Sequence, residues 1–423
     1  MLEAYRARLL CPLLALALMA TGCGDHSKVA SSPPLEELLS GQAPVESEAL
    51  VRLARERVAL GGRWLAGAVR PEGAFFYQYH PYSDAFEEVF DSEVRQAGTT
   101  YALYQVIGIV GDPRMLEAAE GAAGWIERQS VPSHGRPGRA YVYDGSVKLG
   151  GQALALVALL ERRRVTGDRA YDRLIRDLSA FLLSMQVPGR PGEYSHAYDH
   201  ETGTFIPEEH VVFFPGETLL AMTRLAAQGF TDQPWLQRAS ELADFIIRRQ
   251  DFDIPATGRI PREDHWLCIA LSELYRLDPR PEYATVMDLE VSSMLGSLYQ
   301  PDETPPERIG ALRDDAGISY TSTATRGEAL MAAWSLAAHR GDTLMIARIR
   351  AAAERLVQFQ MRVQYTRANT GLFRNPDALI GAWPGSAVIQ DVQIDYVQHN
   401  VSSLANYVHL ASGADIPQHS GPA

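Results

Sequence analysis

The stretch that decides the fold runs from Lys148 to Asp172, KLGGQALALVALLERRRVTGDRAYD. Between Leu154 and Leu160, apolar residues cover too much of a helix surface for one face to be solvated, which predicts a helix buried nearly all round. The pair Gly167-Asp168 predicts the end of this helix. From Tyr171 to Leu182, apolar residues recur every three or four positions between charged ones, which predicts an amphipathic helix packed outside the first. An inner helix and an outer helix therefore form one hairpin.

The same pattern returns along the chain. Further copies occupy residues 94–116, 213–236, 261–283 and 323–346, and a less complete copy occupies 394–413. The outer helices are expected to end at Gln129, Gln186, Gln250, Gln300 and Gln360. A period of roughly 50 to 70 residues, with one hairpin per period, means that each unit buries its apolar face against its neighbours. The repeat predicts a closed ring or an open solenoid.

The N-terminus carries a targeting signal, MLEAYRARLLCPLLALALMATGC. Two arginines precede an apolar run from Leu9 to Met19, and small residues follow it. This stretch resembles a bacterial lipoprotein signal, in which the cysteine of a lipobox becomes the lipidated first residue. Cys23 matches that cysteine, although Ala20 stands where the family more often has leucine. The alternative is an ordinary secretory signal cut nearby, and both interpretations predict an extracytoplasmic protein.

The domain organisation follows from these patterns. We expect a signal peptide at 1–22, a flexible tether at 23–47, a single helical domain at 48–415 and a tail at 416–423. Gly24 after the lipidated cysteine favours outer-membrane over inner-membrane retention, so we expect a lipid-anchored protein of the bacterial cell envelope. Cys268, the one further cysteine of the mature chain, lies in an apolar helix and is predicted to be a core residue.

Short segments rich in glycine and aromatic residues separate the hairpins. They begin at Gly73, Gly138, Gly192 and Gly371, and they alternate like strands. Each lies between an outer helix and the next inner helix. If the inner helices run parallel, these segments and the inner-helix N-termini gather at one mouth of the ring, where loops on a rigid scaffold carry function.

This organisation resembles the alpha/alpha toroid of six-hairpin glycosidases and sugar epimerases. The run GGQALALVALLERRRVTGD is similar to repeats in glucuronyl C5-epimerase-like and N-acylglucosamine 2-epimerase-like toroids. The resemblance implies an all-α fold, an (α/α)6-type toroid with short β-hairpin-like loops at one mouth. Polysaccharide lyases, terpene cyclases and lanthionine cyclases share this architecture, so the fold does not fix the reaction.

The net charge of the chain restricts the classes of binding partner. The formal net charge is −13, which argues against nucleic acid and anionic membrane surfaces as partners. We therefore expect a carbohydrate substrate, and membrane contact through the N-terminal lipid alone. The predicted outer helices are well charged, which favours a monomer.

Ionisable and aromatic residues concentrate at the starts of the predicted inner helices. Acidic residues are common there because they accept hydrogen bonds from free N–H groups, but cations are disfavoured. A mixed set therefore indicates a shared polar pocket. Its members are Arg95, Gln96, Thr99, Lys148, Gln152, Glu217, Asp264, His265, Trp266, Arg326, Glu328, Asp395, Tyr396, Gln398 and His399.

The favoured function is glycoside hydrolysis of a poly- or oligosaccharide, which needs one protonated and one ionised carboxyl group. The candidates are Glu217, Asp264, Glu328 and Asp395. Substrate contacts are assigned to Arg95, Lys148 and Arg326 as holders of an anionic group, to Gln96, Gln152 and Gln398, and to Trp266, Tyr396, Phe213 and Phe214 as apolar platforms.

Two other classes stay open. In a uronate epimerase or a lyase, His265 and His399, or Tyr396, would transfer protons, since histidine titrates near neutrality. Hydrolysis is preferred because a protein outside the cytoplasm meets no free nucleotide sugars. A non-catalytic glycan-binding or assembly lipoprotein is the third class.

Two short clusters raise the possibility of a metal site: Asp264, His265 and Cys268 lie within five residues, and so do Asp395 and His399. Zinc-binding lanthionine cyclases use two cysteines and a histidine, a set that Cys268 alone cannot supply. The acidic motif of terpene cyclases is also missing. We expect no metal and no cofactor.

Overall fold

The computed structural model describes residues 47–87, 92–206, 210–250, 263–302, 305–313 and 318–419. The predicted signal peptide with Cys23, and all of the predicted tether except Ser47, lie outside these residues. The described residues form one compact unit. In the described part of the chain, every helix is too short or too polar to span a bilayer.

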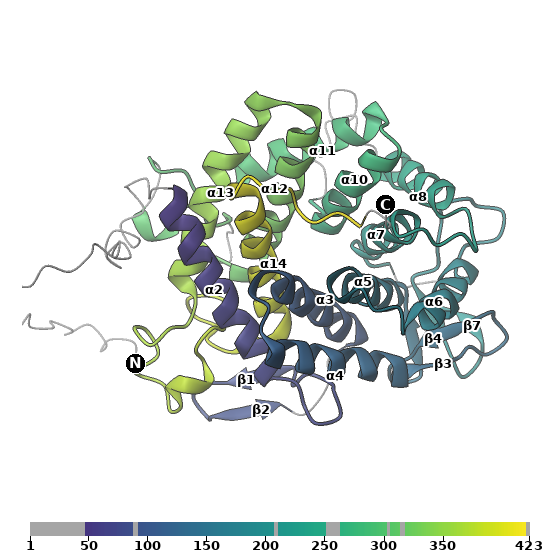
Figure 1. Cartoon of the computed structure of the whole chain (residues 1–423), viewed down its shortest axis with the longest axis horizontal. Coiled ribbons are helices and arrows are strands. Elements are labelled where there is room, and N and C mark those ends of the chain that lie inside the picture. Colours follow the sequence, from purple (N-terminus) through teal and green to yellow (C-terminus); the bar gives the residue numbers. More distant parts are fainter. Residues whose placement is uncertain are drawn as a thin grey trace, which may run out of the picture. The chain divides into compact units, whose positions relative to one another are not determined.

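The inner helices form a closed ring. Each packs on the next, and the last packs on the first, so the ring alternative is confirmed over the open solenoid. Figure 1 shows these helices around the centre of the molecule. They are α3 (Glu93–Val110), α5 (Leu149–Thr166), α7 (Phe214–Ala227), α10 (His265–Leu277), α12 (Tyr320–Arg340) and α14 (Ile394–Ala411).

The outer helices surround this ring. Each of five follows an inner helix in sequence and packs on it: α4 (Pro113–Gln129), α6 (Asp172–Ser184), α8 (Trp235–Gln250), α11 (Pro281–Ser297) and α13 (Thr343–Val363). The incomplete last repeat obtains its outer helix from the start of the domain, because α2 (Ser47–Gly67) packs on α14. The first and last parts of the domain thus complete one hairpin.

The hairpin at Lys148 has the predicted burial. Helix α5 is buried continuously from Leu149 to Arg162, and Gly167 ends it with a left-handed φ of 70°. Helix α6 buries one face, formed by Leu174, Ile175, Leu178, Phe181 and Leu182. A buried helix inside an amphipathic one is what the two hydrophobic patterns require.

In the described part of the chain, three small antiparallel sheets are formed by segments that lie between an outer helix and the next inner helix. The first sheet has the order β2-β1-β8, with β1 (Gln78–His80), β2 (Ala85–Glu87) and β8 (Val392–Gln393). The second pairs β3 (Ser130–Pro132) with β4 (Arg139–Tyr141). The third has the order β5-β6-β7, with β5 (Ser146–Lys148), β6 (Ala197–Asp199) and β7 (Thr204–Phe205). The segment after Gly371 was expected to be strand-like, but residues 371–385 contain turns and a 3-10 helix at Pro376–Ala378. Proline lacks the N–H that a strand pairing needs.

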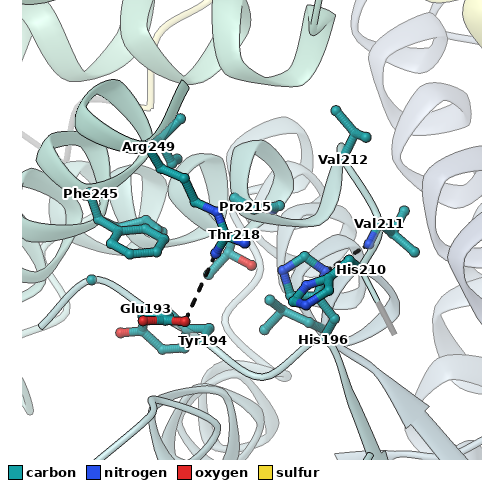
Figure 2. Close-up of a pocket in the computed structure, with 14 residues that line it drawn as sticks. Glu193, Tyr194, His196, His210, Val211, Val212, Pro215, Thr218, Phe245 and Arg249 are labelled. Atoms are coloured by element: carbon teal, nitrogen blue, oxygen red, sulfur yellow. Dashed lines mark hydrogen bonds and ion pairs between the residues drawn. The ribbon is translucent and has the colours of Figure 1, made fainter. Parts of the chain in front are cut away.

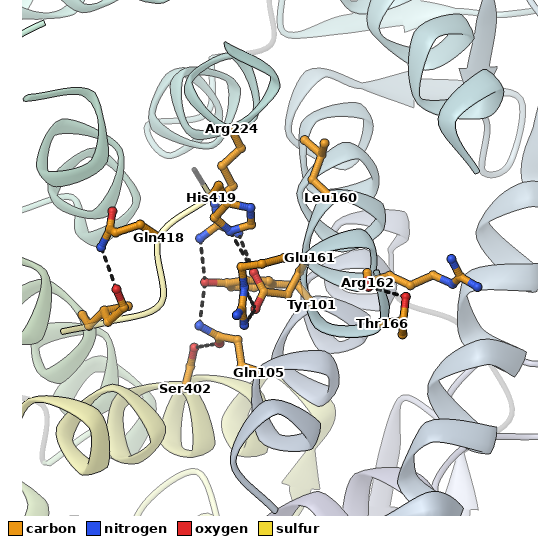
Figure 3. A network of polar contacts seen from close by, with 12 residues as sticks. Tyr101, Gln105, Leu160, Glu161, Arg162, Thr166, Arg224, Ser402, Gln418 and His419 are labelled. Carbon is orange, nitrogen blue, oxygen red and sulfur yellow. Dashed lines mark hydrogen bonds and ion pairs between the residues drawn. The ribbon is translucent and has the colours of Figure 1, made fainter. Parts of the chain in front are cut away.

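The C-terminal segment closes the far end of the ring (Figure 3). His419 is 2% exposed; its Nε2 lies 3.0 Å from Glu161, and its Nδ1 accepts a hydrogen bond of 2.6 Å from Gln228. Arg224 pairs with Glu161 at 3.3 Å and with Glu273 at 2.7 Å. The packed unit therefore extends past the predicted boundary at residue 415.

Candidate active site at the mouth of the ring

A cavity of about 460 Å³ opens where the inner helices begin. We call it the axial cavity. Its wall is made by the first turns of the inner helices and by the residues just before them. The lining residues are Ser92, Val94, Arg95, Lys148, Leu154, Val211, Phe213, Phe214, Glu217, His265, Trp266, Thr321, Ser322, Thr325, Arg326, Asp395, Gln398 and His399.

Two histidines face each other in this wall. The ring centroids of His265 and His399 are 5.1 Å apart, and the ring planes are nearly perpendicular, at 84°. Behind them lies Glu328, whose side chain is fully buried. One oxygen of Glu328 is 2.8 Å from Nδ1 of His399 and 3.8 Å from Nε2 of His265. The same carboxyl oxygen is therefore within hydrogen-bond distance of His399 but not of His265.

The environment separates the pKa values of the two histidines. Burial lowers the pKa of His265 well below its usual range, and His399 and Arg326 lower it further. Burial also opposes the charge of His399, but the charge and hydrogen bond of Glu328 outweigh it and raise the pKa of His399. Burial raises the pKa of Glu328 as well, so the Glu328–His399 pair holds one proton while His265 stays neutral.

A buried polar column continues behind Glu328. Ser402 donates a hydrogen bond to Gln105, and Gln105 donates to the Tyr101 hydroxyl at 2.7 Å. Arg224 reaches the same hydroxyl at 3.3 Å. Figure 3 shows the column from Ser402 to the network at the far end of the ring. An amide and a guanidinium do not pass protons readily, so this column fixes orientation.

Glu217 is the candidate carboxyl group that remains available. It is 3% exposed, it lines the axial cavity, and its Oε2 has no hydrogen-bond partner among the described residues. Burial, and then the charge of Asp264, raise the pKa of Glu217 well above its usual range. Glu217 is therefore a neutral acid that can donate a hydrogen bond to a ligand.

The other two predicted acids have local partners. Asp264 is the N-cap of α10 and accepts hydrogen bonds from the N–H groups of Trp266 and Leu267, at 2.9 and 3.2 Å. Asp264 does not line the axial cavity, so helix capping accounts for it better than catalysis. Asp395 lines the cavity and pairs with Arg95 at 3.2 Å.

Glycines make room for the buried acids. A Cβ at Gly150 would lie 2.1 Å from Oε2 of Glu217, and one at Gly151 would lie 2.4 Å from Cγ of Glu93. Glu93 is fully buried and accepts a hydrogen bond from the backbone N–H of Lys148. The double glycine of the repeat is therefore needed here for side-chain space rather than for a turn.

The cations of the axial cavity differ in whether they are ion-paired, and its aromatic residues differ in exposure. Arg326 is held by Glu263 at 2.6 Å. Lys148 has no carboxylate within ion-pair distance in the described part of the chain, so its amine is available for a ligand. Phe213 is 41% exposed and packs on His265, whereas Trp266 is 3% exposed. Phe213 is the better candidate for a platform under a sugar ring.

Three predicted substrate contacts do not line the axial cavity. Gln96 exchanges hydrogen bonds with the backbone of Phe75, and Gln152 bonds the backbone of Tyr141 and Leu178. Both side chains hold loops in place, because a buried backbone N–H needs a partner. The half-buried Tyr396 lies outside the lining too, so contact of these three residues with a substrate stays a prediction.

Sequence reasoning missed the hydroxyl groups of the wall. Ser92 caps α3, and Thr321, Ser322 and Thr325 come from the first two turns of α12. The run TSTAT at 321–325 was the available signal, because it falls in register with the polar residues of the other inner helices.

One group could hold a metal ion. Nitrogen and oxygen atoms of His265, Glu328 and His399 lie within 4.8 Å of one another. The zinc alternative built on Cys268 is not supported, because Cys268 is a fully buried core residue outside this group. The hydrogen bond of 2.8 Å between Glu328 and His399 fits an imidazole–carboxyl pair that shares a proton.

Comparison with known proteins gives the fold. No protein-family model and no curated protein matches the sequence. Solved structures do match. Cellobiose 2-epimerase from Bacillus thermoamylovorans B4167 superposes with a TM-score of 0.64 at 14% identity, over 85% of this chain and 99% of that one. This chain has the alpha/alpha-toroid fold.

Other alpha/alpha toroids match over similar lengths. A D-mannose isomerase gives a TM-score of 0.62 at 14% identity, over 87% of this chain and 99% of that one. An unsaturated glucuronyl hydrolase specific for heparin gives 0.61 at 12%, over 85% and 98%. The predicted fold class is confirmed. At these identities the likeness concerns the fold, so the function of this toroid has to be argued from its own cavity.

Proposed function

We propose that this toroid is a sugar epimerase or isomerase that transfers a proton at the carbon beside the carbonyl of a reducing sugar. The observation that carries the proposal is the pair His265 and His399, two facing imidazoles on one cavity whose pKa values move in opposite directions. Titratable groups with separated pKa values are the usual acid and base of a site.

The chemistry follows from the protonation states. Neutral His265 takes the proton from C2, the C–H electrons form a C1–C2 double bond, and the carbonyl electrons move to O1. In an epimerisation, protonated His399 gives its proton to the opposite face of C2, the double-bond electrons form the new C–H bond, and the electrons on O1 re-form the carbonyl. In an isomerisation the proton goes to C1, O1 takes up a proton, and the C2 hydroxyl loses its proton to become the carbonyl. Proton exchange with water then restores neutral His265 and protonated His399. Nδ1 of His399 is bonded to Glu328, which leaves Nε2 for the transfer. Neutral Glu217 and the Lys148 amine offer hydrogen bonds to the oxyanion at O1.

The geometry supports this alternative better than the hydrolysis favoured by the sequence. Asp264 caps a helix, Asp395 pairs with Arg95, and Glu328 shares a proton with His399. Of the four predicted acids only Glu217 and Asp395 line the cavity, and Asp395 is held by Arg95, so hydrolysis would depend on this one pair. The cellobiose 2-epimerase and the D-mannose isomerase of the same fold add support.

Hydrolysis remains the second candidate because of one observation. Glu217 is a neutral carboxylic acid at the cavity wall, which is the state that a general acid requires. Solved toroids that hydrolyse or cleave glycans, such as the unsaturated glucuronyl hydrolase, show that the fold accommodates such chemistry.

The deciding experiment follows hydrogen exchange. The protein is incubated in heavy water with reducing mono- and disaccharides, and the C2 proton signal is followed by NMR while chromatography detects epimers, ketoses and fragments. We expect loss of the C2 proton and a new isomer, and loss of both on His265→Asn or His399→Asn. A chelator should have no effect if the histidines act as acid and base.

The control is His339→Asn, an exposed histidine at the opposite end of α12, which should exchange at the wild-type rate. Shortened oligosaccharides with the C2 proton retained would overturn the proposal in favour of hydrolysis. Glycan binding without exchange or cleavage would favour the non-catalytic class.

We also propose that the protein is a monomer anchored to the bacterial cell envelope by a lipid on Cys23. The support is the N-terminal signal and its lipobox-like cysteine. Mass spectrometry of the membrane fraction should find a diacylglyceryl group on Cys23 and none on Cys23→Ser. Light scattering of the delipidated protein tests the monomer.

A further inference from the structure

A second cavity of about 350 Å³ lies beside the axial cavity (Figure 2). We call it the lateral cavity. It is formed by the start of α5, the first turn of α7, the last turns of α8 and the loop from Gly192 to His196. Half of its lining residues have hydrocarbon side chains, namely Leu149, Val211, Val212, Pro215, Leu242, Phe245 and Ile246.

The two cavities are neighbours. Val211 lines both of them. Lys148 lines the axial cavity, and the next residue, Leu149, lines the lateral one. Likewise, Glu217 lines the axial cavity and Thr218 lines the lateral one. The rings of Phe214 and His196, one from each lining, lie 5.8 Å apart. A ligand in the axial cavity therefore needs little length to reach the lateral cavity.

Three polar side chains of the lateral cavity, those of Thr218, His196 and Glu193, are already engaged by the protein. The Thr218 hydroxyl donates to the Phe214 carbonyl at 2.8 Å, and Nδ1 of His196 accepts the Val211 N–H at 2.8 Å. Glu193 is paired with Arg190 at 3.2 Å and with Arg249 at 3.9 Å. A hydroxyl-rich ring would lose its water here and find few free partners, which is unfavourable.

Charge points the same way. Burial lowers the pKa of His196 to about 4, and nearby His210 and Arg249 lower it further, so this imidazole is neutral at pH 7. Glu193 balances Arg249 at the rim, where Figure 2 shows the pair. The two charged side chains of the lining, Glu193 and Arg249, are therefore already in ion pairs within the protein.

We propose that the lateral cavity binds an uncharged apolar group of the substrate, a single ring or a short alkyl chain, while the reacting sugar end occupies the axial cavity. The volume is near the lower end of the range for ligand sites, about 300–1,000 Å³, which suits one such group. The link to a reacting sugar rests on the proposed function. The substrate would be a reducing sugar that carries an apolar substituent.

The first test measures binding without turnover. Cyclohexanol and myo-inositol have six-membered rings, one apolar and one hydroxyl-rich, and their binding to the full chain can be compared by saturation-transfer NMR and calorimetry. We expect cyclohexanol to bind and inositol to bind at least tenfold more weakly. Val212→Trp fills the cavity and should reduce cyclohexanol binding at least tenfold. Leu344→Trp, a tryptophan at a 73% exposed site on α13, is the matched control.

The second test uses turnover. The KM values of 4-O-benzyl- and 6-O-benzyl-glucose are compared with that of glucose, and at least one benzyl ether should have a tenfold lower KM that Val212→Trp abolishes. Inositol binding as tight as cyclohexanol, or binding of cyclohexanol unchanged in both Val212→Trp and Phe245→Ala, would overturn the proposal. Cyclohexanol binding that is sensitive to Val212→Trp, without any exchange at C2, would refute the proposed function alone.

Discussion

His399 and His265 approach the same oxygen of Glu328 from two helices, at 2.8 and 3.8 Å. The shorter contact stabilises a proton on His399, while burial keeps His265 neutral. The difference of 1 Å, together with the burial of all three groups, shifts the pKa values of two chemically identical side chains in opposite directions, as the proposed acid and base require.

Glu328→Gln should lower the pKa of His399. Glutamine keeps a hydrogen-bond acceptor near Nδ1 but removes the negative charge, and burial then favours neutral imidazole. In the wild type, the rate of C2 proton exchange should fall at high pH, where His399 loses its proton. In the variant, this fall should occur at a lower pH than in the wild type. NMR titration of His399 reads the pKa directly, even if turnover is absent. An unchanged His399 titration would contradict the assigned role of Glu328.

Asp264 should make stability depend on pH. Burial raises its pKa from an ordinary value of 3.8 to about 7, although two backbone N–H groups oppose the shift. The folded state therefore binds more protons than the unfolded state across this window, so its contribution to stability falls as the pH rises from 3.8 to 7. Asp264→Asn keeps the cap and should remove this pH dependence from the free energy of unfolding, measured by urea titration between pH 4 and 8. Asp264→Ala, which loses the cap, should cost about 1 kcal/mol.

Gly150→Ala should displace Glu217. The added Cβ would lie 2.1 Å from the Glu217 carboxyl and 2.3 Å from the Phe214 ring. Overpacking of this kind costs about 1–3 kcal/mol, and kcat should fall because the acid moves. Melting curves and exchange rates check both effects. The control is Gly124→Ala on the outer helix α4, where the nearest atom is the end of a flexible Arg128 side chain at 3.2 Å.

Gln152→Ala should destabilise the fold by about 1–3 kcal/mol, because the buried N–H of Tyr141 loses its acceptor. Gln398, which lines the axial cavity, is the comparison: Gln398→Ala should raise KM with little change in the unfolding midpoint. A raised KM for Gln152→Ala without destabilisation would restore its predicted contact with substrate.

The polar residues at the inner-helix starts could be predicted in part. Register along the repeats identified Arg95, Lys148, Glu217, His265 and His399 as wall residues, and the axial cavity brings them together. Register could not separate Gln152, which points to a loop, from Gln398, which points to the cavity. Both occupy the first turn of a buried helix, and only the direction of the side chain differs.

The sequence by itself determined the repeated hairpins of an inner and an outer helix, because hydrophobic period and repeat length are local properties that dictate which faces must be buried. Tertiary structure decided the chemistry. That α2 completes the last hairpin, that Glu328 lies between two histidines from other helices, and that Asp264 is a cap all depend on contacts between segments far apart in the chain. Burial and charge at such contacts set each pKa, and no local pattern encodes them.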